Sequence, residues 1–251
     1  MRNNAIFDGL KGKSALVTGA GSGIGAALAR GLGKLGVKVV CTARTQANLD
    51  SVASEITSNG GTAFAFAADA TNADQMTALT DKIDAELGGL DLAYLNAGGN
   101  WQQETIMKSD ADEWKDALDQ NLMPVFHGIR TVVPLMRKKG GGRIIFTGSA
   151  MAHYAAATNS SYCSGKAAAR MLANTAALEL ASDNITVNEF IPGPVRSLQA
   201  LARFDESDKN SPFNNSKEWV KEPEDVVDTL LFMAAFPGAG PTSQIFSLAR
   251  R

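Results

Sequence analysis

Short apolar runs alternate with longer segments of helical periodicity, and this alternation restricts the fold more than any other feature of the sequence. Short runs bounded by turn residues indicate buried strands, and the longer amphipathic segments between them indicate helices. Strand, helix and strand in this order form βαβ units, which place the strands parallel in one sheet. The sequence therefore predicts an α/β fold with a doubly wound parallel sheet, as a single domain over residues 1–251.

The expected elements follow this alternation as far as residue 235. Strands are expected at residues 15–18, 37–43, 63–67, 90–95, 143–147 and 186–191. Helices are expected at residues 24–35, 46–58, 72–87, 110–138, 161–181 and 226–235. The polar residues 198–219 interrupt the rhythm and cannot bury enough apolar surface to be core. A lid over a site and a plain surface loop both fit this segment, and the lid is our prediction.

Composition excludes several classes of protein. With 45% hydrophobic residues, the chain can form one sizeable core. The net charge of -2, without a long basic run, gives no basis for binding nucleic acid or an anionic membrane. Two cysteines do not make a disulfide framework, and the N-terminus lacks the apolar run of a signal peptide. No metal site is predicted, and the expected location is the cytoplasm.

A glycine-rich turn follows the first expected strand and precedes the first expected helix. Gly19 can supply the tight turn, Gly23 can let backbone amides approach a pyrophosphate, and Gly25 can let helix and strand pack closely. The helix N-terminus then offers unpaired N–H groups to the phosphates. A strand before and a helix after the glycines predict a Rossmann-type dinucleotide site. Its candidate contacts are Gly19, Gly21, Ser22, Gly23, Ile24 and Gly25.

The spacing of these residues, Thr-Gly-x-x-x-Gly-x-Gly, resembles that of the short-chain dehydrogenase/reductase family. Further motifs of the family recur as far as about Ala235. Asp69 with Ala70 resembles the position that contacts the adenine amino group, although a turn or cap residue would look the same. The sequence Asn-Ala-Gly after the fourth expected strand and a Pro-Gly loop after the sixth also match the family. The implied cofactor contacts are Asp69, Ala70, Asn96, Ala97, Gly98, Pro192, Gly193, Val195 and Ser197.

The end of the second expected strand bears on the choice between NADP and NAD. An acid there would accept hydrogen bonds from the ribose 2′-hydroxyl, whereas a guanidinium suits a 2′-phosphate. Ala43 stands where NAD-preferring relatives carry Asp, and Arg44 stands where NADP-preferring relatives carry Arg. Ser22 replaces a second basic residue that many NADP-dependent relatives carry in the turn. NADP is therefore the predicted cofactor, and NAD stays the alternative.

Tyr162 and Lys166 are the strongest candidates for catalysis. Residues four apart lie on one face of a helix, so the tyrosine hydroxyl and the lysine ammonium can reach the same cavity. An ammonium group favours the phenolate and lowers a tyrosine pKa that is about 10 in isolation, which suits proton transfer near neutral pH. Ser149 lies thirteen residues before Tyr162, just after an expected buried strand. The resemblance implies a Ser, Tyr and Lys set, with Asn121 matching the family's catalytic Asn, which supports a water chain to the lysine.

The resemblance implies hydride transfer between NADP(H) and a carbonyl or secondary alcohol. A mixture of polar and aromatic candidates favours a small or medium polar substrate over a steroid. The candidate pocket residues are Asn100, Trp101, Met151, His153, Tyr154, Arg196, Phe204, Phe213 and Trp219.

Two alternatives for the function stay open. One is a 3-oxoacyl-(acyl carrier protein) reductase, although relatives of that type tend to carry Arg where this chain has His127 and Leu178. The other is a non-catalytic nucleotide-sensing protein, which would be marked by loss of the Tyr or the Lys. The family resemblance also implies a homotetramer. Residues 241–251 depart from the apolar strand and Gly-Gly turn with which relatives commonly end, which leaves the geometry of the oligomer open.

Overall fold

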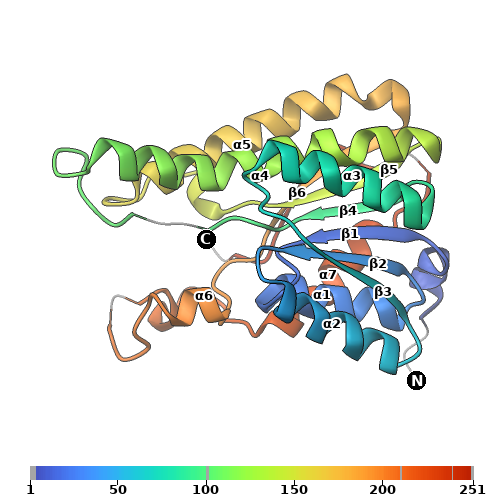
Figure 1. The fold of residues 1–251 in the computed structure, drawn as a ribbon. Helices are drawn as coiled ribbons and strands as arrows, with labels where there is room; N and C mark the ends of the chain where they lie inside the picture. Colours follow the sequence, from blue (N-terminus) through green and yellow to red (C-terminus); the bar gives the residue numbers. More distant parts are fainter. Residues whose placement is uncertain (1–3, 100–101, 210, 239, 250–251) are drawn as a thin grey trace.

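The computed structural model describes residues 4–99, 102–209, 211–238 and 240–249, and these residues form a parallel sheet between two layers of helices (Figure 1). Its seven strands lie in the order β3-β2-β1-β4-β5-β6-β7, and all their pairings are parallel. The strands are β1 Ser14–Thr18, β2 Lys38–Ala43, β3 Thr62–Ala67, β4 Leu92–Leu95, β5 Gly142–Thr147, β6 Ile185–Ile191 and β7 Ile245–Ser247. The predicted doubly wound fold and its first six strands are confirmed.

Strand β7 is an element that the sequence analysis did not include. It pairs in parallel with β6, with Ile245 beside Glu189 and Phe246 beside Phe190. Ile245 is 44% exposed, and Phe246 packs against the core from a partly buried position. An edge strand of three residues with one inward side chain is too short to produce an alternating pattern in the sequence.

Helices cover both faces of the sheet. Figure 1 shows α1, α2 and α7 on one face and α3, α4 and α5 on the other. The helices are α1 Gly23–Lys34, α2 Gln46–Ser58, α3 Ala73–Leu87, α4 Ala111–Lys138, α5 Ser160–Glu179, α6 Leu198–Leu201 and α7 Val227–Ala234. The helix expected at 226–235 is preceded by a 3-10 turn, Pro223–Val226, with proline in its first turn. No helix among these residues is long and apolar enough to cross a membrane.

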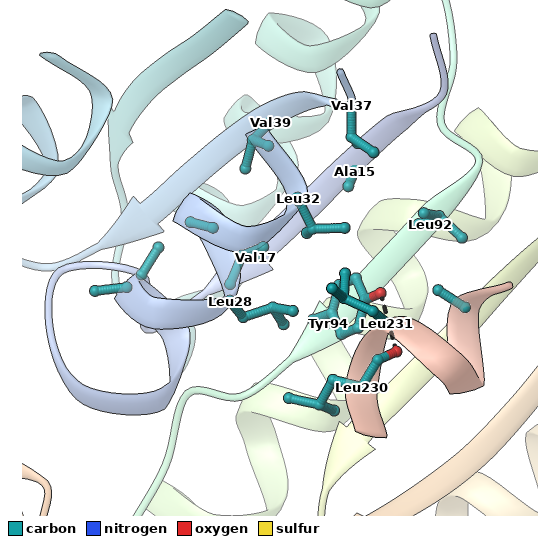
Figure 2. Close-up of a cluster of buried hydrophobic side chains, with 14 of the residues drawn as sticks. Ala15, Val17, Leu28, Leu32, Val37, Val39, Leu92, Tyr94, Leu230 and Leu231 are labelled. Carbon is teal, nitrogen blue, oxygen red and sulfur yellow. Dashed lines mark hydrogen bonds between the residues drawn. The ribbon is translucent and has the colours of Figure 1, made fainter. Parts of the chain in front are cut away.

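Two hydrophobic clusters fill the space between the sheet and the helix layers. Figure 2 shows the cluster under α1 and α7, where Leu28 and Leu32 pack toward Val17 and Tyr94. The Tyr94 hydroxyl donates to the Leu230 carbonyl oxygen at 3.4 Å, which pairs its one polar group inside the core. The strands next to the site are fixed by this packing on both faces.

Parallel strands bring all their carboxyl ends to one edge of the sheet. The chain leaves β1 toward β2, whereas β4 pairs on the other side of β1 and leads toward β5. The loops after β1 and β4 therefore diverge and leave a crevice, which is where open α/β sheets bind ligands. Residues 198–219 extend from the same edge and contain α6 and a 3-10 turn, Pro212–Asn214 (Figure 1).

Candidate active site

The glycine-rich turn between β1 and α1 forms an open cradle of backbone amides. Gly19 has φ +68° and Gly23 has φ +52°, a region that residues with a side chain rarely adopt. A Cβ on Gly25 would lie 2.3 Å from the carbonyl oxygen of Gly19, so the close packing of α1 on the turn requires glycine there. Ser22 makes no side-chain cap hydrogen bond, and the first turn of α1 holds no acidic residue. The first N–H groups of the helix are thus available to an anion.

Thr18 and Asn96 hold this turn against the neighbouring strand ends. The Thr18 hydroxyl accepts the N–H groups of Asn96 at 2.9 Å and Ala97 at 3.0 Å. The side-chain oxygen of Asn96 in turn accepts a hydrogen bond from the Thr147 hydroxyl at 3.0 Å. Asn96 thus ties neighbouring strands together, since β1, β4 and β5 meet in this network.

Arg44 and Asp69 line the cavity beyond the ends of β2 and β3. Arg44 is exposed and makes no hydrogen bond or ion pair with any residue that the structure describes. Burial raises the pKa of Asp69, but hydrogen bonds from Thr71 and the charge of Arg44 outweigh this effect and leave its pKa below the usual value. The Thr71 N–H and hydroxyl donate to Asp69 Oδ1 at 2.9 and 2.7 Å. Asp69 is therefore an ionised turn residue beside the cavity.

Tyr162 and Lys166 lie one turn apart on α5 and both reach the cavity wall. The Lys166 Nζ lies 5.9 Å from the centre of the Tyr162 ring and donates to the carbonyl oxygen of Thr147 at 3.0 Å. Each of the two residues is only 6% exposed. Burial lowers the pKa of Lys166 to about 8, and the negative charge of Glu189 acts in the opposite direction. The ammonium is thus held beside the phenol ring in a mostly buried position.

Ser149 faces the same cavity from the end of β5. It precedes a single 3-10 turn, η2 Ala150–Ala152, and its Oγ accepts the Met151 N–H at 3.2 Å as the N-cap of that turn. The predicted Ser, Tyr and Lys are therefore brought together at one cavity by β5, η2 and α5.

Asn121 lies behind this group on α4 and is 2% exposed. Its Oδ1 accepts the Gly99 N–H at 3.0 Å, and its Nδ2 donates to the Ala117 carbonyl oxygen at 2.8 Å. Helix α4 continues through this position to Lys138. Pro124 has no N–H, so the carbonyl of Gln120 lacks its usual partner one turn along the helix. Asn121 thus fixes the loop after β4, and its catalytic role stays a prediction.

The loop after β6 closes the other side of the cavity. Gly193 has φ +69°, and a Cβ there would lie 3.1 Å from Cα of Ala249, so the C-terminal segment packs directly on this loop. Ser197 caps α6 by accepting the Ala200 N–H at 3.2 Å. The side chain of Gln199 crosses from α6 and donates to the Gly99 carbonyl oxygen at 2.6 Å. This bond links residues 198–219 to the loop after β4.

A single cavity of about 730 Å³ collects most of the predicted site residues. The predicted residues in its wall are Gly19, Gly21, Ser22, Gly23, Ile24, Arg44, Asp69, Ala70, Asn96, Ala97, Gly98, Ser149, Tyr162, Lys166, Pro192, Gly193, Val195 and Ser197. Gly25 and Asn121 support this wall from behind.

The predicted substrate pocket is only partly reproduced. Met151, Tyr154, Phe204 and Phe213 line the cavity. His153, Arg196 and Trp219 do not: His153 turns to Glu189, and Arg196 pairs with Glu206 at 2.8 Å and Glu222 at 3.5 Å. Asn100 and Trp101 lie outside the described residues. Nearby carboxylates draw two of these side chains away from the cavity, which local sequence does not reveal.

Comparison with known proteins identifies the fold family. Residues 13–208 match the short chain dehydrogenase family. The chain belongs to this short-chain dehydrogenase/reductase family. It is 31% identical over 226 residues to 3-oxoacyl-(acyl-carrier-protein) reductase FabG of Vibrio cholerae, which covers 90% of this chain and 91% of that protein.

Two solved structures extend the comparison. A 7α-hydroxysteroid dehydrogenase in complex with NADH and 7-oxo glycochenodeoxycholic acid superimposes with a TM-score of 0.89 at 30% identity, over 98% of this chain and 96% of that one. The L-sorbose reductase of Gluconobacter frateurii, complexed with NADPH and L-sorbose, gives 0.86 at 26% identity, over 96% of each chain. This short-chain dehydrogenase/reductase is thus an NAD(P)-dependent oxidoreductase for carbonyl or alcohol groups.

The residues of this short-chain dehydrogenase/reductase fit such a dinucleotide. The pyrophosphate would bind at the N-terminus of α1, where the backbone at Gly19 and Gly25 leaves no room for a side chain. Arg44 and Asp69 would lie toward the adenosine half, and the loop from Pro192 to Ser197 toward the nicotinamide half.

Three residues that lie beside this site were missed in the sequence analysis. Asn48 lines the cavity at the start of α2, Gln199 joins α6 to Gly99, and Glu189 lies behind Ser149 and Lys166. Of these, Glu189 could have been found from the sequence, because it is the one carboxylate within the strand expected at residues 186–191. A charged residue in a buried strand is rare without a specific role.

Proposed function

We propose that this enzyme reduces the carbonyl group of a small or medium polar compound with NADPH, or oxidises the corresponding alcohol, with Tyr162 as general acid and base. The observation behind the proposal is the convergence of Ser149, Tyr162 and Lys166 at one wall of the dinucleotide-sized cavity. When bound, the nicotinamide supplies the hydride. We prefer catalysis to a purely nucleotide-sensing role, because loss of the Tyr or the Lys would mark such a role and both are present.

Each protein group has a distinct task in this proposal. The Ser149 hydroxyl donates a hydrogen bond to the substrate oxygen, and the Tyr162 phenol gives that oxygen a proton as negative charge develops. The Lys166 ammonium favours the phenolate and so makes the phenol a stronger acid. Thr147 holds that ammonium through its carbonyl oxygen at 3.0 Å. We propose that Asn121 keeps open the path by which water returns a proton to the pair.

NADPH is the proposed cofactor because Arg44 stands at the end of β2 with its guanidinium uncommitted to any described partner. Its charge is balanced only in part by Asp69, on which it acts electrostatically. A 2′-phosphate would supply the missing counter-charge and the planar contact that a guanidinium favours. Ala43 carries no acid that would repel it.

The outer part of the cavity supports a polar substrate. Its wall combines the aromatic rings of Phe204 and Phe213, which meet edge to face at 6.2 Å, with the polar side chains of Gln199, Asn215 and Glu218. Such a mixture suits a compound that carries hydroxyl or amide groups on a small apolar frame. The L-sorbose bound in one structural relative is of this kind.

Reduction of a 3-oxoacyl thioester is the second candidate, favoured by the similarity to FabG of Vibrio cholerae. That reaction needs a basic surface for an acidic carrier protein. Here Leu178 is 79% exposed and His127 is 9% exposed, at positions where relatives of that type tend to carry Arg. The two residues weaken this candidate. A homotetramer and a cytoplasmic location stay predictions.

The test is a Tyr162→Phe variant assayed with a panel of ketones, sugars and acyl thioesters. We expect turnover to fall on the order of 100-fold to 10,000-fold, because the proton donor is lost, while NADPH still binds. Tyr94→Phe is the matched control, since it removes a hydroxyl that lies in the core rather than at the cavity. Wild-type turnover in Tyr162→Phe would reject the assigned acid, and preference for acyl thioesters would select the second candidate.

A further inference from the structure

A buried carboxylate lies directly behind the proposed catalytic serine. Glu189, on β6, has a side chain that is 3% exposed. A Cβ on Gly148 would lie 2.0 Å from its Oε1, so the carboxylate passes immediately beneath the backbone that leads into Ser149. Only a glycine at 148 makes room for this approach. Neither residue is part of the cofactor and catalytic set described above.

The same carboxylate lies against residues on both sides of the η2 turn. Before the turn, its Oε1 packs against the backbone at Gly148 and makes no hydrogen bond with any described residue. At the end of the turn, Nε2 of His153 lies 3.1 Å from Oε2. The turn itself is held by the Ala152 N–H to the Ser149 carbonyl oxygen and the His153 N–H to the Ala150 carbonyl oxygen, each at 2.9 Å. One turn of 3-10 helix is weak by itself, so an anchor at both ends will decide how firmly Ser149 is oriented.

Charged groups surround Glu189 from two elements. His153 comes from η2, while Arg170 on α5 has its Nε 3.8 Å from Oε2, and Lys166 is on the same helix. The partners of Glu189 in the neighbouring strands, Phe146 and Ile245, are apolar. Burial raises the pKa of Glu189, while His153 and Arg170 favour its ionised form. Its negative charge favours the protonated form of Lys166.

We propose that Glu189 is a positioning residue for the active site: its carboxylate packs against Gly148 before the η2 turn and pairs with His153 after it, and so holds in place the turn that begins at Ser149. This inference rests on the proposed reduction by Tyr162 and Lys166. The clamp holds the serine hydroxyl where the substrate oxygen binds, and a misplacement of about 1 Å in such a group can cost about 100-fold in rate. The negative charge of Glu189 also keeps the lysine able to favour the phenolate.

The decisive variant is Glu189→Gln, which keeps the shape of the side chain and removes its charge. We expect kcat to fall about 10-fold or more, with the KM for NADPH changed by less than about twofold, because Glu189 lies behind the cavity wall and does not itself line the cavity. The alkaline limb of the kcat/KM profile should move to lower pH by about 0.5 unit or more, because Lys166 then loses its proton more readily. Glu179→Gln is the matched control at the exposed end of α5 and should leave the rate and the profile unchanged.

Two further variants separate the clamp from the charge. His153→Leu removes the hydrogen bond at one end of the clamp and keeps the carboxylate, so kcat should fall while the alkaline limb does not move to lower pH. Glu189→Asp keeps the charge with a shorter reach, so it should restore the limb and only part of kcat. The proposal would be overturned if folded Glu189→Gln kept both the wild-type kcat and the wild-type position of the alkaline limb of the kcat/KM profile. A loss of thermal stability with unchanged kinetics would overturn it as well.

A third measurement does not depend on any substrate. Hydrogen exchange of the peptide covering residues 148–153 should become faster in Glu189→Gln and stay unchanged in Glu179→Gln, because the turn loses its anchor. Unchanged exchange would overturn the clamp even if the wild-type enzyme reduced none of the compounds tested. The proposed function fails separately, when the wild type is inactive on the whole panel or Tyr162→Phe keeps wild-type turnover.

Discussion

Replacement of Lys166 by methionine should change how the stability of the cofactor-free protein depends on pH. Lys166 is 6% exposed, and burial lowers its pKa from 10.5 to about 8. At about 1.36 kcal/mol per pKa unit, the folded state disfavours the charged lysine by roughly 3 kcal/mol relative to the unfolded chain. That penalty is fully present below the folded pKa, where the lysine is charged in both states. It disappears above the unfolded pKa, where the lysine is neutral in both.

The sign of the effect follows from proton binding. Between the two pKa values, the unfolded chain binds a proton that the folded protein does not, so the stability of the wild type rises with pH. The methionine side chain of the variant binds no such proton, so the variant lacks this rise. From about pH 7 to about pH 9.5, the free energy of unfolding of the wild type should gain about 2 kcal/mol relative to Lys166→Met. Contributions that do not depend on pH, such as loss of the bond to Thr147, cancel in this difference.

The assay is urea unfolding of both proteins at the two pH values, with turnover measured in parallel. Lys108→Met is the matched control, because Lys108 is exposed and its replacement should leave the difference constant. A wild-type minus Lys166→Met difference that stays the same within about 0.5 kcal/mol would show that Lys166 is not held as a buried ammonium. The argument that the lysine sharpens the acidity of Tyr162 would then lose its basis.

Two other substitutions test the cofactor site. Arg44→Asp should raise the KM for NADPH about 10-fold or more while changing that for NADH much less, because it replaces the cation that would meet a 2′-phosphate with an anion; equal effects on the two would refute the contact. Gly25→Ala should weaken dinucleotide binding and destabilise the protein by about 1 to 3 kcal/mol through overpacking, against a gain of up to about 1 kcal/mol in helix propensity. A dinucleotide titration measures the affinity, and urea unfolding measures the stability. Gly9→Ala is the control, because a Cβ at Gly9 would meet no atom within 4 Å, and it should be neutral in both measurements.

Local pattern was sufficient for most of the fold and for the catalytic pair. The apolar run of β1 is buried along its whole length, so hydrophobicity alone marks it. Tyr162 and Lys166 lie on one helix, where a spacing of four residues fixes their relation before any tertiary contact forms. The glycines of the turn are recognisable in the same way, because the backbone at Gly19 and the close approach at Gly25 exclude other residues.

The contacts that the sequence did not predict join segments that are far apart along the chain. The bond from Gln199 to Gly99 joins residues one hundred positions apart, and it depends on how the loops after β4 and β6 meet. His153 was a candidate pocket residue because it follows Ser149, yet it turns to Glu189, whose place is set by the pairing of β5 with β6. Strand β7 likewise forms only because the edge of β6 is available to it. None of these contacts leaves a periodic trace in its own segment.

The polar groups of the site are satisfied mostly by main-chain atoms, and this separates catalysis from substrate choice. Lys166 donates to the Thr147 carbonyl, and Asn121 bonds to the Gly99 N–H and the Ala117 carbonyl, so both are held by the ends of core elements. Side chains could vary widely around them without disturbing these bonds. The outer wall comes instead from residues 198–219, which pack on the core mainly through Phe213 and Gln199. Changes in that segment should therefore alter KM for the substrate far more than the steps that depend on Tyr162 and Lys166, which lie on α5.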